Sequence, residues 1–412
     1  MNQAAFPDVV ATAQHGWDLV RALHAAGHDV TVIGSRSRYG DRGAAFPESE
    51  VAEGILIRRV RASRFGRGRL AAQALDAAAF LLGACWQALR LPRADLCICL
   101  TTPPFVALIG WVLARLRGTP YILWSMDLYP DVPVALGVLP QRSIMARILY
   151  GIEQRLLRGA ARVVVLGRCM EHRLLEKGLA VERIARIHIW APRDHGPTVD
   201  PDYRTRWEVG DRLLVAYAGN FGLVHDLDPI IDTVIRLGDH PDIRFAFIGE
   251  GPLKAELVRR LRVAGVKNWV EAGYQPREAL AALLTAPDLH LASLHAGFEG
   301  LAVPSKVLGA MAVGRPVIYV GAAVGECARV IAESGGGAVV PNGDAAALAD
   351  VLVRYAADRE SVREAGARAR TAVDTQWSTG QALAAWTTLV ETIGPTAQGP
   401  RSPTPCAAPP PR

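Results

Sequence analysis

Hydrophobic and polar positions follow two alternating patterns along the chain. Short apolar runs, such as residues 96–100 (LCICL) and 213–217 (LLVAY), have the length and composition of buried strands. Longer stretches with apolar residues at helical spacing, such as residues 228–237, separate these runs. This alternation predicts parallel β-sheets covered by helices, which is the α/β class.

The predicted elements fall into two series. Strands are expected at residues 29–34, 55–60, 96–100, 121–124, 162–166 and 184–189, and again at 213–217, 244–248, 269–271, 289–293, 317–319 and 337–340. Helices are expected at residues 9–26, 70–91, 105–116, 147–158 and 170–177, and again at 228–237, 254–264, 345–357, 362–372 and 373–393.

The break between the two series predicts two domains, and 412 residues are enough to build two cores. Residues 1–190 are expected to form the N-terminal domain, 191–206 a linker and 207–375 the C-terminal domain. A C-terminal helix is expected over residues 376–393. The last segment, 394–412, is rich in Pro, Ser and Thr, which predicts a disordered tail.

The beginning of the first domain departs from the usual doubly wound order. Such a domain normally starts with an apolar strand that precedes the first helix. The opening residues MNQAAFP do not form such a pattern. We therefore expect that the first strand of the N-terminal domain is missing and lies upstream of Met1, which would make Met1 a misassigned or truncated start.

The charge distribution distinguishes the two halves. Residues 1–200 hold 25 Lys and Arg against 17 Asp and Glu, whereas residues 201–412 hold 21 against 23. A basic half suggests an anionic partner, such as a membrane surface, a lipid-linked phosphate or nucleic acid. An arginine-rich genome is the alternative, because 42 of the 46 basic residues are arginines. Six arginines crowd one segment: Arg58, Arg59, Arg61, Arg64, Arg67 and Arg69.

Other features of the composition favour a cytoplasmic location. The six cysteines show neither CxxC nor metal-ligand spacing, so we expect free thiols and no metal. The opening residues lack the pattern of a signal peptide. The most apolar stretches, 77–91 and 105–116, are too short to cross a membrane. They are expected to be core helices or a peripheral membrane-contact surface.

The most informative motif is FEGLAVPSKVLGAMAVGRPVI, residues 298–318. Pro304 and Ser305 suit the first positions of a helix, and Gly314 suits its C′ position. Lys306 would then lie in the first helical turn, beside free N–H groups, in an arrangement suited to a diphosphate. The alternative is an ordinary surface lysine at a helix start.

Two glycine-bearing turns follow predicted strands in the second half. The first is Gly219-Asn220-Phe221-Gly222 with His225-Asp226, and the second contains Gly249 and Gly251. Glycine lets backbone N–H groups approach phosphates closely. Lys254 stands where a dinucleotide fingerprint needs its third glycine, which argues against a dehydrogenase. Gly249 and Gly251 could equally serve the turn itself.

Two polar segments follow neighbouring strands in the first half. They are TTPP, starting at Thr101, and WSMDLYPD, which contains Asp127. Ligands of open α/β sheets bind at the carboxyl ends of strands. For Asp127, the alternative role is the N-cap of the following helix.

Over residues 5 to about 390, these segments together resemble the family 4 retaining glycosyltransferases of the GT-B fold. The run from Tyr217 to Asp226 resembles the Y-x-G-N-x-G-x-x-H-D run of the subgroup that assembles bacterial exopolysaccharide, colanic acid or O antigen. The PSK segment, the DLYP segment, TTPP and the opening PDVVATAQ also resemble elements of that subgroup. The resemblance implies two Rossmann-like doubly wound parallel-sheet domains that face a cleft, with the C-terminal helix, residues 376–393, returning to the first domain.

The resemblance also implies roles for individual residues. The catalytic candidates are Asp127, which could orient or polarise the acceptor hydroxyl, Glu299, which could bind the donor sugar, and Lys306. The donor-binding candidates are Gly219, Asn220, Gly222, His225, Gly249, Gly251, Tyr274, Gln275, Ser305 and Lys306. The acceptor-side candidates are Gln14, Thr101, Thr102 and Asp127.

One departure from the family pattern concerns the ribose contact. The family usually carries two glutamates with seven residues between them. Gly309 stands where the second should be, and nine residues separate it from Glu299. This departure puts the ribose contact in doubt.

The implied function is transfer of a sugar, hexosyl or N-acetylhexosaminyl, from a nucleotide-diphosphate-sugar to an acceptor hydroxyl with retention. The expected acceptor is a polyprenyl-diphosphate-linked glycan, with the protein peripheral on the inner face of the cytoplasmic membrane. Neither a cofactor nor nucleic acid is expected. The alternatives are a sugar-nucleotide epimerase of the same fold and a non-catalytic nucleotide-sugar-binding partner.

Overall fold

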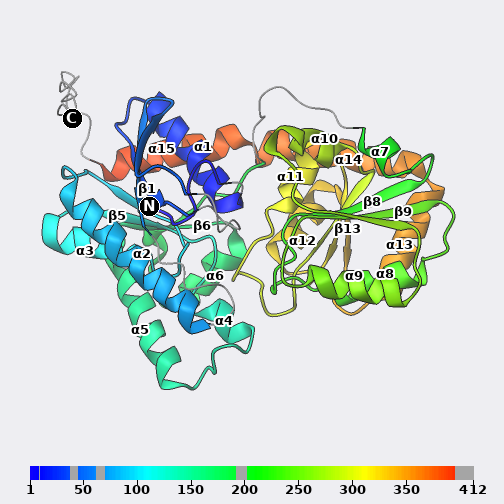
Figure 1. Cartoon of the computed structure of the whole chain (residues 1–412), viewed down its shortest axis with the longest axis horizontal. Helices are drawn as coiled ribbons and strands as arrows, with labels where there is room; N and C mark the ends of the chain where they lie inside the picture. The colour runs from blue at the N-terminus through cyan, green and yellow to red at the C-terminus, as the bar shows by residue number, and fades with distance from the viewer. Residues whose placement is uncertain (9, 38–44, 62–69, 192–201, 395–412) are drawn as a thin grey trace.

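The computed structural model describes residues 1–8, 10–37, 45–61, 70–191 and 202–394, which form two α/β bodies (Figure 1). The predicted tail beyond residue 394 and most of the predicted linker lie outside the described residues. So do Arg64, Arg67 and Arg69 of the arginine-rich segment.

The first domain contains two sheets. The three-stranded sheet has the order β1-β3-β2, and the four-stranded parallel sheet has the order β4-β5-β6-β7. The strands are β1 (Thr31–Ser35), β2 (Ser49–Ala52), β3 (Ile55–Val60), β4 (Cys97–Cys99), β5 (Tyr121–Trp124), β6 (Arg162–Val165) and β7 (Ile184–Arg186). Strand β2 was not predicted, because this short antiparallel edge strand alternates between exposed and half-buried residues and carries little apolar signal.

Residues 1–3 lie between the two sheets. The N–H of Asn2 donates to Ile33 O (3.2 Å) on the β1 side, and the N–H of Leu100 donates to Met1 O (3.1 Å) on the β4 side. In the described residues no strand precedes the first helix. The predicted upstream strand remains a prediction.

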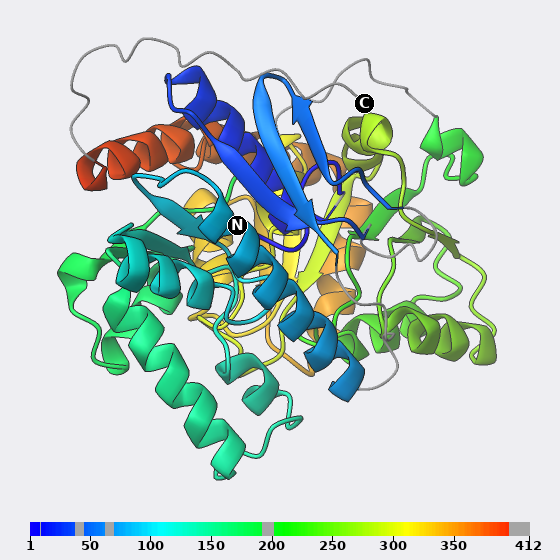
Figure 2. The ribbon, with the colours of Figure 1, turned by 60° about the vertical axis from the view of Figure 1, so that its left-hand side comes forward.

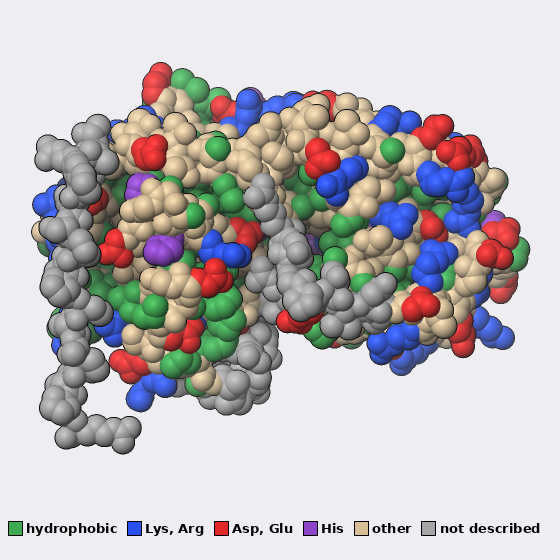
Figure 3. Space-filling model, turned by 90° about the horizontal axis from the view of Figure 1, so that it is seen from above, with side chains coloured by type: hydrophobic (Ala, Val, Ile, Leu, Met, Phe, Trp, Pro, Cys, Tyr) green, Lys and Arg blue, Asp and Glu red, His purple; other side chains and the backbone are tan. Residues whose placement is uncertain are grey.

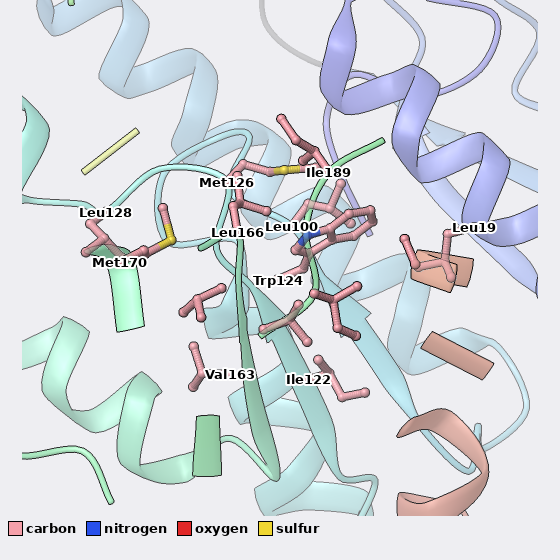
Figure 4. Packing of buried hydrophobic residues seen from close by; sticks show 14 of the residues in the cluster. Leu19, Leu100, Ile122, Trp124, Met126, Leu128, Val163, Leu166, Met170 and Ile189 are labelled. Atoms are coloured by element: carbon pink, nitrogen blue, oxygen red, sulfur yellow. The ribbon is translucent and has the colours of Figure 1, made fainter. Parts of the chain in front are cut away.

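Helices cover both sheets of the first domain. They are α1 (Ala11–Ala25), α2 (Leu70–Arg90), α3 (Ala107–Arg117), α4 (Asp131–Ala135), α5 (Ile144–Gly159), α6 (Arg168–Glu176) and a 3-10 turn, η1 (Val181–Arg183). The core gathers around Trp124 of β5, with Leu100, Met126 and Ile189 among its neighbours (Figure 4). Arg59 of the arginine-rich segment is also buried in this domain, on β3. Its guanidinium donates to Glu50 Oε1 of β2 (2.6 Å), so Arg59 does not belong to a basic surface.

The second domain contains one parallel sheet with the order β10-β9-β8-β11-β12-β13. Its strands are β8 (Leu213–Ala218), β9 (Ile243–Ile248), β10 (Trp269–Ala272), β11 (Leu289–Ser293), β12 (Val317–Val320) and β13 (Gly337–Val340). The strand order reverses between β8 and β11, and at such a switch point the carboxyl ends of the strands form a crevice.

Helices lie on both faces of this sheet (Figure 1). They are α7 (Tyr203–Arg206), α8 (Asp228–Arg236), α9 (Lys254–Val263), η2 (Arg277–Ala279), α10 (Leu280–Thr285), α11 (Lys306–Ala312), α12 (Glu326–Ser334), α13 (Ala345–Ala357) and α14 (Arg359–Gln376). Helix α7 corrects the predicted linker, which was expected to extend to residue 206. Tyr203 and Trp207 bury their rings against the sheet, so this part of the chain belongs to the second domain.

The last helix, α15 (Thr379–Ile393), lies beside α1 of the first domain (Figure 2). The ring of Trp386 lies 4.7 Å from that of Trp124. A single helix over residues 373–393 was predicted, and this is wrong. Ser378 and Gln381 form a capping box that starts a separate helix after α14 ends.

Candidate active site

The two glycine turns of the second domain pack directly on each other. Gly249 has φ +124°, and a Cβ there would lie 1.9 Å from Gly219 O. A Cβ on Gly251 would lie 2.5 Å from Phe221 O. The N–H groups of Gly219 and Phe221 donate to Ile248 O (2.8 Å) and Glu250 O (2.9 Å). Gly249 and Gly251 are therefore required for packing between the turns, and two of the amides in the first turn already have partners.

Lys306 lies over the first of these turns. Its Nζ is 3.3 Å from Asn220 O and 3.7 Å from the ring centroid of Tyr217. Within the described part of the chain no carboxylate pairs with this ammonium, and burial lowers its pKa well below the ordinary value. A partly buried cation without a counterion favours binding of an anion.

The start of α11 differs in part from the prediction. Ser305 is the N-cap residue, but its side chain caps no N–H group, and the helix has only seven residues. Gly314 follows the helix with φ +72°, as predicted. Attraction for an anion therefore rests on Lys306 rather than on the end of a long helix.

His225 is held as a neutral acceptor beside Lys306. Its Nδ1 lies 2.6 Å from Ser293 O, and because a carbonyl can only accept, Nδ1 carries the proton. Burial lowers the pKa of His225 to about 3, and the charge of Lys306 contributes. Nε2 therefore presents a lone pair, which can accept from a hydroxyl but cannot donate to a phosphate.

Asp226, next in the motif, has a structural task. Its Oδ2 accepts from Asn342 Nδ2 (2.7 Å), which also donates to Leu294 O (2.9 Å). These bonds hold the segment after β11 that leads to Glu299.

Glu299 lies on a loop that contacts the first domain. Its Oε2 accepts from the N–H of Gly297 (2.8 Å), and its Oε1 is buried without a partner among the described residues. Its carbonyl oxygen accepts from Arg173 Nε of α6 (3.1 Å). Gly300 has φ +77°, and a Cβ there would lie 2.5 Å from Cys169 O, so the close approach of the two domains requires a glycine.

Asp127 of the first domain lies beside this loop. It forms an antiparallel bridge with Ala302, and burial raises the pKa of its carboxyl to about 6. The alternative role as a helix N-cap is wrong, because α4 begins at Asp131 after Pro130, with no side-chain cap. Asp127 and the Glu299 loop thus meet in the structure.

A cavity of about 40 Å³ extends from Asp127 into the first domain. Thr101 also lines it, with a buried Oγ1 that has no partner among the described residues. Glu153, which sequence reasoning missed, lines the same cavity. Its Oε1 accepts from Lys177 Nζ (2.6 Å), and burial raises its pKa to about 7. No local motif marks Glu153, because it is one acidic residue on an amphipathic helix.

The contacts of the remaining candidates are structural. Gln275 donates from Nε2 to Gly273 O (3.0 Å) and accepts from Tyr203 of α7 at Oε1 (3.2 Å), so it holds α7 to the domain. The neighbouring Tyr274 is half exposed. Thr102 uses its backbone to hold Asn2 and Gln3, and Gln14 lies on α1.

Gly309, where the family carries a glutamate, is buried in α11. A Cβ there would meet its nearest neighbour outside the helix, Leu284 Cδ1, at 3.9 Å. The position therefore has room for a small side chain.

Two facing parallel-sheet domains and a C-terminal helix that returns to the first define the GT-B class of fold. Sucrose-phosphate synthase (tll1590) from Thermosynechococcus elongatus matches with a TM-score of 0.73 and 18% identity, over 93% of this chain and 94% of its own. Anabaena Alr3699/HepE, solved in complex with UDP-glucose, matches with a TM-score of 0.69 and 13% identity, over 95% and 98%. At these identities the likeness shows the fold.

Sequence similarity identifies the family. Residues 12–190 match the glycosyl transferase 4-like domain, and residues 212–358 match the glycosyl transferases group 1 domain. Two relatives carry provisional names: the glycosyltransferase WbjE of Pseudomonas aeruginosa (29% identity over 280 residues) and the colanic acid biosynthesis glycosyl transferase WcaI of Escherichia coli K12 (30% over 210 residues). The alignments cover 64% and 49% of this chain, and 66% and 51% of the relatives. The chain belongs to the family 4-type glycosyltransferases, which confirms the resemblance seen in its motifs.

Proposed function

We propose that the protein transfers a sugar from a nucleotide-diphosphate-sugar to a hydroxyl of an acceptor held by the first domain. The observation that carries this proposal is the position of Lys306. Its ammonium lies without a carboxylate partner among the described residues, over a glycine turn at the carboxyl end of β8. A diphosphate there would supply the missing counterion.

The groups around Lys306 suit the sugar of the donor. His225 can accept from a sugar hydroxyl, and Glu299 keeps one buried oxygen without a partner among the described residues. The complex of HepE with UDP-glucose supports a nucleotide sugar as the ligand. We propose a hexosyl or N-acetylhexosaminyl donor on this basis.

The proposed chemistry depends on positioning. Asp127 would hold the acceptor hydroxyl beside the donor sugar, because its segment pairs directly with the Glu299 loop. Lys306 would stabilise the charge that develops on the leaving diphosphate, which could then take the proton from the acceptor on the same face. That geometry gives retention, and no cofactor takes part.

A lipid-linked acceptor at a membrane surface is the second part of the proposal. The described helices contain none long and apolar enough to cross a membrane. Helix α2 packs against α3, and α3 packs against α5. All three helices expose large apolar side chains. These are Leu75, Leu82, Trp86, Leu116, Ile144, Met145 and Ile148. Arg90 and Arg115 lie over the rings of Trp86 and Trp111, so cations accompany the apolar surface.

A transfer assay tests the activity. Purified protein is incubated with bacterial membranes and a panel of labelled nucleotide sugars. We expect that one donor releases its nucleoside diphosphate only when acceptor is present, and that the product retains the anomeric configuration. We expect Lys306→Ala to abolish this activity. Lys267→Ala, a change at an exposed residue, is the control and should keep full activity. Donor turnover without any acceptor, or an active Lys306→Ala variant, would contradict the proposal.

Sedimentation with anionic liposomes tests the membrane surface separately. Ile144→Asp is expected to reduce binding, whereas Val263→Asp, a similarly exposed change in the second domain, is not. Equal binding of both variants, or no binding of the unchanged protein at low salt, would argue against the surface.

A further inference from the structure

The second domain contains another cavity, of about 410 Å³, at the opposite end of its sheet from Lys306. Asp211 and Asp288 precede strands β8 and β11, and Arg315 precedes β12, whereas the glycine turns follow the carboxyl ends. The parallel order of the strands therefore separates the two sites. The charged residues that line this second cavity are Arg204, Asp211, Asp288, Arg315, Arg359 and Arg363.

Positive charge is in excess around this cavity, with four arginines against two aspartates in its lining. The same oxygen of Asp288, Oδ2, accepts from Leu214 N (2.7 Å), Arg204 Nη1 (3.2 Å) and Arg359 Nη1 (3.4 Å). One carboxylate thus serves two guanidinium groups. Burial lowers the pKa of Arg315. The nearby charge of Asp288 raises this pKa, and that of Arg204 lowers it.

The guanidinium groups are held in place by neutral acceptors. Arg204 donates to Ala286 O (3.1 Å) and Arg212 O (3.2 Å), and Arg359 donates to Asp211 O (2.9 Å). Arg315 donates through Nε and Nη2 to Thr285 O. Carbonyl groups orient these cations in addition to the shared carboxylate of Asp288, so less entropy is lost when an anion binds.

We propose that this cavity is a binding site for a phosphorylated small molecule, distinct from the donor site. Planar guanidinium groups match the oxygens of a phosphate. The volume lies within the range of about 300–1,000 Å³ that is usual for small-molecule sites. Seen from above, the second domain shows Lys and Arg side chains interspersed with Asp and Glu (Figure 3).

The cavity lies between α7 and the start of α14. Arg204 belongs to α7, the first described helix after Ala191 ends the first domain. Arg359 and Arg363 belong to α14, which leads into α15 on the first domain. Arg359 and Arg363 lie near the start of this 18-residue helix, and the passage to α15 follows its other end. An effect of the bound phosphate compound on sugar transfer would rest on the proposed function. Binding of the phosphate compound to this cavity does not depend on that function.

Calorimetry with the full chain tests the site. The ligands are inorganic phosphate, pyrophosphate and a hexose phosphate, and the background is Lys306→Ala, which disables the donor site. Arg363→Gln is the main variant, because Arg363 is 65% exposed and pairs only with Glu360 among the described residues. Arg368→Gln is the matched control, since Arg368 is 53% exposed and pairs with Glu364 on the same helix, outside the cavity.

We expect phosphate compounds to bind the Lys306→Ala protein, with affinity reduced about tenfold by Arg363→Gln and unchanged by Arg368→Gln. Tighter binding of the hexose phosphate than of inorganic phosphate would identify an organic phosphate as the ligand, and equal binding would identify free phosphate. No binding at millimolar concentration, or equal effects of Arg363→Gln and Arg368→Gln, would overturn the proposal. We also expect that Arg363→Gln, measured with Lys306 present, leaves the affinity for the donor unchanged. A failure of this phosphate site can therefore be distinguished from a failure of the proposed function.

Discussion

The backbone N–H of Leu128 in the first domain donates a hydrogen bond to the carbonyl oxygen of Leu301 in the second, at 3.0 Å. Asp127 and Ala302 form a bridge next to this bond. The acceptor-side segment and the Glu299 loop are therefore parts of one small pairing that joins the two domains. A donor sugar bound by Glu299 would lie beside Asp127.

Replacing Lys306 with alanine is expected to weaken binding of a nucleoside diphosphate by roughly 2–3 kcal/mol, because a charge-assisted contact is lost. Calorimetry measures this, with Lys267→Ala as the control. Affinity within twofold of the unchanged protein would remove Lys306 from the donor site.

Binding of a diphosphate should also take up protons. Burial holds the pKa of Lys306 well below its ordinary value, and an anion beside the ammonium would raise it. Affinity should therefore fall as the pH rises through the pKa of the free protein. Calorimetry in buffers of different ionisation enthalpy measures the proton count, and a count that Lys306→Met does not change would contradict this assignment.

Asp127→Asn is expected to raise the free energy of unfolding at pH 7.5 by about 1–3 kcal/mol while it removes transfer activity. The folded pKa of about 6 exceeds the ordinary value of 3.8, so the folded protein binds the proton more tightly than the unfolded chain does. Stability of the unchanged protein therefore falls as the pH rises from about 4 to 6, and the charged form carries this cost above pH 6.

Thermal unfolding at pH 4 and pH 7.5 measures the difference between the two proteins. The increase in the free energy of unfolding caused by Asp127→Asn should nearly vanish at pH 4, because Asp127 is largely protonated there. A gain that is the same at both pH values would show that desolvation of the carboxylate is not its cause.

Gly309→Ala is expected to stabilise the protein by about 0.5–1 kcal/mol, because glycine in a helix costs backbone entropy and a Cβ has room there. Gly249→Ala is the contrasting change, since its Cβ would lie 1.9 Å from Gly219 O. Urea unfolding should show opposite signs for the two variants. A destabilised Gly309→Ala protein would show that the space beside α11 is not available.

Arg168 of α6 joins the first domain to α12 of the second. It donates from Nη1 to Glu333 Oε1 (2.5 Å), and its backbone N–H donates to Glu326 Oε2 (2.7 Å). Because the Arg168–Glu333 pair is partly exposed, we expect a coupling free energy of only about 0.2–1 kcal/mol in a cycle of Arg168→Gln and Glu333→Gln. A coupling near zero would show that the pair does not help to hold the domains together.

Local signals predicted much of this fold. The apolar runs predicted β3 and β5 residue for residue, and the end of α11 followed from Gly314. The missed elements include the edge strand β2 and the helices α4, α7, α10 and α12. Helix α7 is stable through the burial of Tyr203 and Trp207 against the sheet, which no neighbouring residue reveals.

The sequence by itself determined the family, the two α/β domains and the segments that carry the candidate residues, because strand periodicity, glycine turns and motif spacing are properties of neighbouring residues. Only the tertiary structure decided what these segments do. It brought Asp127 to the Glu299 loop, assigned Gly249 to turn packing, and gathered Arg204, Arg315 and Arg359 around one cavity. Those relationships depend on burial and on contacts between residues far apart in the chain, and such contacts leave no periodic trace in the sequence.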